Sequence, residues 1–136
     1  MIRTKTIYLS FLLFCLSFSG IAQTIKGYTK AEIDDYSAKV EDQVRFLEYL
    51  LNTIGSTETQ SRDKDVVIRE SYLKIFRDGE VQVEDDLLLD RKVVTNKNVT
   101  AYLKDIEFFY KDVNFKFKIR EVKPHQKDNG DVYFTA

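Results

Sequence analysis

The fold is decided by one stretch of the sequence, TKAEIDDYSAKVEDQVRFLEYLLNTI, at residues 29–54. Its apolar residues recur at steps of three or four, which places them on one stripe of a helix. Thr29 and Glu32 have the spacing of a capping box, in which each residue satisfies a backbone N–H of the other. Gly55 follows the stripe, where a left-handed C-cap is expected. This stretch therefore predicts one long amphipathic helix whose stripe is Ile33, Tyr36, Val40, Val44, Leu47, Leu51 and Ile54.

Two shorter helices are expected further along the chain. After a polar segment at 55–65, helical spacing favours a helix over about 62–77. The rival interpretation is a hairpin that turns at Asp78-Gly79, because Asp-Gly is a common two-residue turn. A third helix should begin near Asn96–Asn98 and end at Tyr110. Asn98 also begins a formal glycosylation sequon, which we interpret as part of the helix start.

The strands are predicted from alternation of apolar and polar residues. Residues 81–84 are predicted to form a short strand and 85–92 a loop, and Val93-Val94 is expected to pair back briefly. The clearest strand is VNFKFKIR at 113–120, with one apolar face on the helices and one polar face in water. A polar connection with a tight turn at Asn129-Gly130 leads to a last strand at 131–136. Because a domain rarely ends in mid-strand, we expect the natural chain to continue beyond Ala136.

The order helix, helix, strand, helix, strand, strand resembles the nuclear transport factor 2-like fold. SYLKIF at 71–76 followed by VQVEDDL at 81–87 looks like the junction between the second helix and the first strand of such domains. The chain departs from the pattern because the further antiparallel strands of that fold are missing. The expected fold class is α+β, a single domain over 23–136 with a long helix and two shorter ones on a curved antiparallel sheet.

The resemblance implies a pocket between sheet and helices, in which a buried aspartate beside a tyrosine would be a plausible general base. The residues that could line it are Tyr72, Phe76, Asp86, Tyr102 and Asp105. In the alternative interpretation, Tyr72 and Phe76 are ordinary core, and Tyr102 and Asp105 flank the helix stripe and face solvent. Fold analogy alone does not decide between the two.

The N-terminus has the three zones of a cleavable signal peptide. Arg3 and Lys5 precede an uncharged apolar run at 7–18, and Gly20-Ile21-Ala22 is a small-x-small exit before Gln23. The apolar run is shorter than the roughly 20 residues of a spanning helix, which argues against a stable membrane anchor. The signal resembles those of exported proteins of Bacteroidota. We therefore expect residues 1–22 to be removed and the protein to be periplasmic or secreted.

Composition makes several functions improbable. The signal peptide carries two of the 21 basic residues and none of the 22 acidic ones, so the mature chain has a formal charge of −3. No basic patch or glycine-rich phosphate loop favours nucleic acid or nucleotide binding. Cys15, the single cysteine, leaves with the signal, so the mature domain has no disulfide. The sequence indicates no cofactor.

A metal site is not expected. His125, the single histidine, is predicted in an exposed loop and has no cysteine or second histidine beside it. The densest acidic cluster does not match the spacing of a calcium loop, so it is interpreted as solvated carboxylates. Its members are Glu80, Glu84, Asp85, Asp86 and Asp90.

Three functional hypotheses follow. The first is a non-enzymatic interaction or accessory domain of an exported bacterial protein, whose partner is another protein or a downstream domain of the same chain. The second is a nuclear transport factor 2-like small-molecule-binding domain or cofactor-free enzyme. The third is a homodimer through the long helix, with Val40, Leu47 and Leu51 in the seam, although packing against the 113–119 strand would use the same surface.

Overall fold

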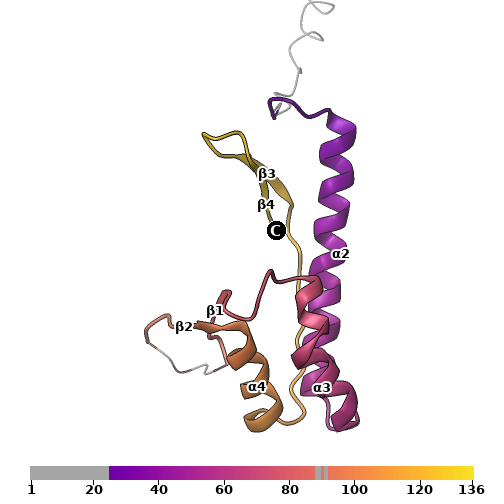
Figure 1. Cartoon of the computed structure of the whole chain (residues 1–136), viewed down its shortest axis with the longest axis vertical. Coiled ribbons are helices and arrows are strands. Elements are labelled where there is room, and N and C mark those ends of the chain that lie inside the picture. The colour runs from indigo at the N-terminus through magenta and orange to yellow at the C-terminus, as the bar shows by residue number, and fades with distance from the viewer. Residues whose placement is uncertain (1–24, 88–89, 91) are drawn as a thin grey trace, which may run out of the picture.

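Helix α2, Lys30–Gly55, is the axis beside which the other elements lie (Figure 1). The computed structural model describes residues 25–87, 90 and 92–136, so the predicted signal peptide at 1–22 lies outside the described residues. A hairpin lies beside the N-terminal half of α2, and two shorter helices pack at its C-terminal end. The α+β class with a long first helix is confirmed. The described strands form two separate two-stranded antiparallel sheets instead of one curved sheet.

The start of α2 is as predicted. Thr29 N–H donates to Glu32 Oε2 (2.8 Å) and Glu32 N–H donates to Thr29 Oγ1 (3.3 Å), which completes the capping box. The predicted left-handed cap at Gly55 is wrong, because Gly55 is the last helical residue and Ser56 is the C-cap in an extended conformation. Gly55 has a different role: a Cβ there would lie 2.5 Å from the carbonyl oxygen of Val113. The glycine permits the chain to approach the helix closely.

The helical interpretation of the second segment is confirmed over its first part only. Helix α3 covers Ser61–Arg69 and a 3₁₀ turn, η1, covers Ser71–Lys74, so the single helix predicted to residue 77 is wrong. The break lies at Glu70, whose φ of −130° is outside the helical range. The rival hairpin does not form, because the strand after Gly79 pairs with a later segment instead.

The first sheet joins β1, Gln82–Glu84, to β2, Asn96–Asn98, with Val83 opposite Lys97. The predicted pairing through Val93-Val94 is wrong: both side chains are exposed, and the pairing begins later, at Thr95, whose carbonyl oxygen accepts from Asp85 N–H. Helix α4, Val99–Phe109, follows β2 directly. Asn98 is its N-cap, as predicted, because its Oδ1 accepts a hydrogen bond from Ala101 N–H at 2.9 Å.

The segment predicted as a strand at 113–120 is extended but pairs with no strand among the described residues. Its partner is helix α2. Val113 N–H donates to Gly55 O (3.2 Å), and Phe117 N–H donates to Glu48 Oε2 (2.6 Å). Between them, Asn52 bonds both backbone groups of Phe115, at 2.7 and 2.8 Å. The predicted alternation is correct, since odd residues tend to be covered and even ones are exposed, but helix side chains replace the expected neighbouring strand.

The C-terminal hairpin pairs β3, Lys123–Gln126, with β4, Val132–Thr135, around a turn at Asn129-Gly130 in which Gly130 has a φ of +92°. The prediction that residues around Pro124 form a connection is therefore wrong. Lys127 N–H donates to Asp131 O, and hydrogen-bonded pairs alternate in an antiparallel ladder. The nitrogen of Pro124 consequently points away from β4, where proline costs no ladder bond.

The core lies where the C-terminal end of α2 meets α3, η1 and α4. Its buried side chains are Leu50, Leu51, Ile54, Val67, Ile68, Tyr72, Val99, Tyr102, Leu103 and Ile106. The hairpin stands outside this core and contacts α2 through Phe134, whose ring centroid lies 6.0 Å from that of Tyr36. Among the described helices, none is long and apolar enough to cross a membrane.

Candidate functional site

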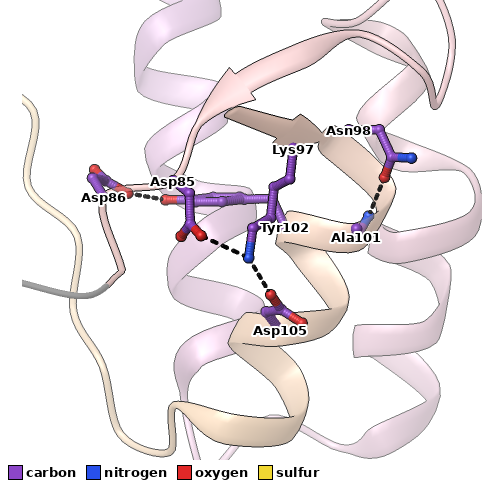
Figure 2. A network of polar contacts seen from close by, with 7 residues as sticks. All are labelled: Asp85, Asp86, Lys97, Asn98, Ala101, Tyr102 and Asp105. Carbon is purple, nitrogen blue, oxygen red and sulfur yellow. Dashed lines mark hydrogen bonds and ion pairs between the residues drawn. The ribbon is translucent and has the colours of Figure 1, made fainter. Parts of the chain in front are cut away.

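The structure divides the five predicted pocket residues. Asp86, Tyr102 and Asp105 belong to a polar network of two adjacent sets of contacts at the junction of the first sheet and α4, which Figure 2 shows from close by. Tyr72 is buried and lines a separate hollow between α3 and α4. Phe76 is partly buried against the core.

Lys97 is the centre of the first part of this network (Figure 2). Its ammonium group lies 2.9 Å from Asp85 Oδ2 and also pairs with Asp105 on α4. The sheet explains the arrangement, because Asp85 N–H donates to Thr95 O and so extends the β1–β2 pairing by one residue. Asp85 is 5% exposed. Hydrogen bonds to Asp105 and then Asp85 raise the pKa of Lys97, so the ion pair is maintained at neutral pH.

Tyr102 forms the second part of the network. Its hydroxyl donates to Asp86 Oδ1 at 2.7 Å, and its ring is buried, which contradicts the alternative that it faces solvent. Burial first, and the hydrogen bond to Asp86 second, raise the pKa of the Tyr102 phenol above its ordinary value. The phenol therefore stays protonated as a donor. Asp86 thus accepts from the phenol, and Asp85 and Asp105 are paired with the ammonium group of Lys97, which suits a structural role better than proton transfer.

The hollow at Tyr72 is polar and open. Tyr72 and Ile68 form its floor, and its rim includes Thr100, Lys104 and Phe108 of α4. The absence of a side chain at Gly79 permits close packing beside this hollow, because a Cβ there would lie 3.1 Å from the Tyr72 hydroxyl and 2.7 Å from Thr100 Cγ2.

The acidic residues of the predicted cluster do not share one environment. Asp85 is buried and pairs with Lys97, so its interpretation as a solvated carboxylate is wrong, whereas the other four are exposed. Within the described residues, no group of three or more histidine, cysteine or acidic side chains is arranged to hold a metal ion. His125 lies in β3 and is partly buried, so its predicted exposed-loop position is wrong. Its ring stacks on Tyr133 with a centroid distance of 5.0 Å, and Nε2 lies 2.9 Å from Thr135 Oγ1.

The structure also contains a backbone feature that sequence reasoning missed. In an extended chain, the N–H and C=O groups of successive residues point to opposite sides. Because residues 113, 115 and 117 direct theirs toward α2, those of Asn114, Lys116 and Lys118 point away from it. In the part of the chain that the structure describes, no hydrogen bond engages these three N–H groups. We call the backbone groups of Asn114, Lys116 and Lys118 the open edge.

The extended segment leads directly into β3. Lys123, the first residue of β3, pairs with Thr135, so the end of β4 lies at the point where the extended segment enters the hairpin.

A hollow confirms that the end of β4 and the extended segment are neighbours. Thr135 and Ala136 line it together with Lys118, Arg120, Glu121 and Lys123. Its basic side chains outnumber its acidic one, and Glu121 is paired with Lys123 at 2.6 Å. This hollow lies beside the Lys118 end of the open edge, and we call it the basic recess.

No protein-family model, curated protein or solved structure matches the chain, so the site is interpreted from its own geometry.

Proposed function

We propose that the chain is a non-enzymatic interaction domain of an exported bacterial protein, and that it binds an extended polypeptide along the open edge. The observation that carries the proposal is the state of residues 113–119: one side is hydrogen-bonded to α2, while the N–H groups of the other side have no partner among the described residues. An extended peptide added to such a side gains backbone hydrogen bonds without remodelling the protein.

Preorganisation supports this function. The bonds from Gly55, Asn52 and Glu48 hold the segment extended before any partner arrives. Ordering a backbone residue costs about 1–2 kcal/mol, and here the protein bears that cost during folding instead of during binding. Open sheet edges are recognised as pairing sites for the same reason.

The variant Lys116→Pro tests the proposal. Lys116 N–H has no partner in the described chain and Phe115 is extended, so Lys116→Pro should fold and lose one donor of the open edge. Lys116→Ala is the matched control, because it removes the same side chain but keeps the N–H. The probes are fluorescent, end-capped octapeptides in which valine alternates with glutamate, threonine or lysine.

We expect at least one of these peptides to bind the wild-type protein and Lys116→Ala, to slow amide exchange at the open edge, and to fail with Lys116→Pro. Equal melting temperatures for the two variants would attribute the loss to the edge. Binding that survives Lys116→Pro, or no binding of any of the three peptides, refutes the proposal.

A second candidate is a small-molecule-binding domain or cofactor-free enzyme of the nuclear transport factor 2-like type. The buried Tyr102 with its bond to Asp86, and the hollow at Tyr72, favour it. A fragment library screened by thermal shift supplies the probes. Ligands whose binding is lost in Tyr72→Phe or Asp86→Asn, at unchanged melting temperature, would support this candidate, whereas unfolding of both variants would assign the residues to the core.

A further inference from the structure

The exposed side chains along the open edge are basic. Lys116, Lys118 and Arg120 are exposed, and no ion pair within the described ranges engages them, although Lys118 and Arg120 line a hollow together with Glu41 and Glu48 of α2. This differs from the exposed lysines of α2, since Lys30 and Lys39 pair with aspartates one turn away at 2.6 and 2.7 Å. The positive charges beside the open edge are therefore available to a partner.

In an antiparallel pair, side chains opposite one another on the same face lie about 5 Å apart, and opposite charges there are favourable. A bound strand with carboxylates on its solvent face would place them beside Lys116 and Lys118. Alternate residues of the strand would lie on the other face, next to Phe117, which is 39% exposed. Apolar residues at those positions would cover its ring.

The hairpin indicates the direction of the strand. Strand β4 runs antiparallel to β3, which continues the extended segment. Its last residues line the basic recess with Lys118, Arg120 and Lys123. A strand that continues the line of β4 would run antiparallel to residues 113–119 and would begin in this recess, where a carboxylate is stabilised.

A second copy of the chain fits the open edge poorly. Antiparallel pairing of two copies through this edge would bring Lys116 and Lys118 of one copy against the same residues of the other. Like charges directly opposite one another destabilise a strand pair. The charge pattern therefore disfavours a second copy as the occupant.

We infer, on the basis of the proposed function, that the open edge binds an extended segment of a separate polypeptide, antiparallel to residues 113–119 and in line with β4, whose acidic residues alternate with apolar ones.

The octapeptides that alternate valine with glutamate, threonine or lysine test this inference by fluorescence anisotropy. We expect the glutamate peptide to bind about tenfold more tightly than the threonine peptide, since two or three cross-strand ion pairs each contribute a modest preference. The lysine peptide should bind least, and added salt should reduce the difference. The double variant Lys116→Glu, Lys118→Glu should reverse the order, while Arg62→Glu, a single charge reversal at an exposed residue of α3, should leave it unchanged.

Direction is tested with a nitroxide spin label on either end of the glutamate peptide. A label at its N-terminus should broaden the amide signals of Thr135 and Ala136, and a label at its C-terminus those near Val113. The opposite pattern overturns the antiparallel arrangement.

The outcomes separate this inference from the proposed function. If all three peptides bind equally and Lys116→Pro abolishes binding, the acidic preference is wrong and strand binding stands. If none binds, both are wrong. A dimer in light scattering that Lys116→Pro converts to a monomer would make a second copy the occupant and overturn the inference.

Discussion

The side-chain amide of Asn52 holds the backbone of Phe115 from both sides of the peptide. Asn52 Nδ2 donates to Phe115 O at 2.8 Å, and Asn52 Oδ1 accepts from Phe115 N–H at 2.7 Å. These are the two bonds that a hydrogen-bonded residue of a neighbouring strand would make. One asparagine on a helix therefore substitutes for a sheet partner and keeps the segment extended.

Asn52→Ala should destabilise the protein by about 1–3 kcal/mol, because it leaves a donor and an acceptor of a partly buried backbone without partners. Urea denaturation measures the loss, and amide exchange should accelerate most at Phe115. Thr53→Ala is the control: Thr53 Oγ1 bonds only Tyr49 O within the same helix, so the change should stay within about 0.5 kcal/mol. Equal effects of the two variants would contradict the role assigned to Asn52.

Gly55→Ala should also be destabilising, by about 1–3 kcal/mol, because the new methyl group would lie 2.5 Å from Val113 O and 2.7 Å from Val113 Cγ1. The sign of the change in the free energy of unfolding distinguishes two explanations of this glycine. If Gly55 were only a flexible helix end, alanine would stabilise the helix by up to about 1 kcal/mol. Ala38→Gly, at an exposed position of α2, measures that propensity difference in the same helix. A stabilised Gly55→Ala variant would show that no close approach limits this position.

The elements that could be predicted are those with a local signal. The 3.6-residue stripe and the capping box locate α2, Asn98 locates the start of α4, and Asn129-Gly130 locates the last turn. Alternation at 113–120 correctly indicates an extended segment. It says nothing about the backbone partner, because alternation reports only where side chains point. The bonds from Asn52 and Glu48, more than 60 residues away, have no local signal.

The same limit applies to the polar network. The sequence predicts Asp86 and Tyr102 as residues of one pocket, and the structure joins them by a hydrogen bond. It does not predict the role of Lys97, since the contact of Lys97 with Asp85 depends on the β1–β2 register, in which Val83 lies opposite Lys97. A register that joins strands twelve residues apart cannot be read from either strand alone.

Asn98→Ala should cost about 0.5–2 kcal/mol, because Asn98 Oδ1 caps α4 by accepting from Ala101 N–H. Asn98→Ser keeps an acceptor at the cap and should recover most of the loss. Thermal denaturation compares the two. If serine were as destabilising as alanine, the contribution of Asn98 would lie in its contact with Glu80 on the loop before β1 rather than in capping.

Lys97→Met should destabilise the protein by about 3 kcal/mol at neutral pH, since it removes the ammonium group that compensates the buried carboxylate of Asp85. We expect a loss at the lower end of the free energies typical for breaking a buried ion pair, because the Lys97 side chain is itself 24% exposed. The double variant Lys97→Met, Asp85→Asn should recover part of the loss, as it removes the buried charge. If the stability losses of the two single variants simply add in the double variant, there is no specific interaction energy between Lys97 and Asp85.

The pair also predicts the pH dependence of stability. Its hydrogen bonds raise the pKa of Lys97 in the folded protein above the ordinary lysine value of 10.5. The contribution is therefore fully present below about pH 10.5 and is lost as the pH rises through the folded value, where the folded state must release the proton as well. Tyr102 acts in the same direction, because its pKa is also raised above that of an ordinary phenol. We expect the free energy of unfolding of the wild-type protein to fall faster above pH 10 than that of Lys97→Met. Parallel curves for the two proteins would mean that Lys97 carries no raised pKa and that alkaline unfolding has another source.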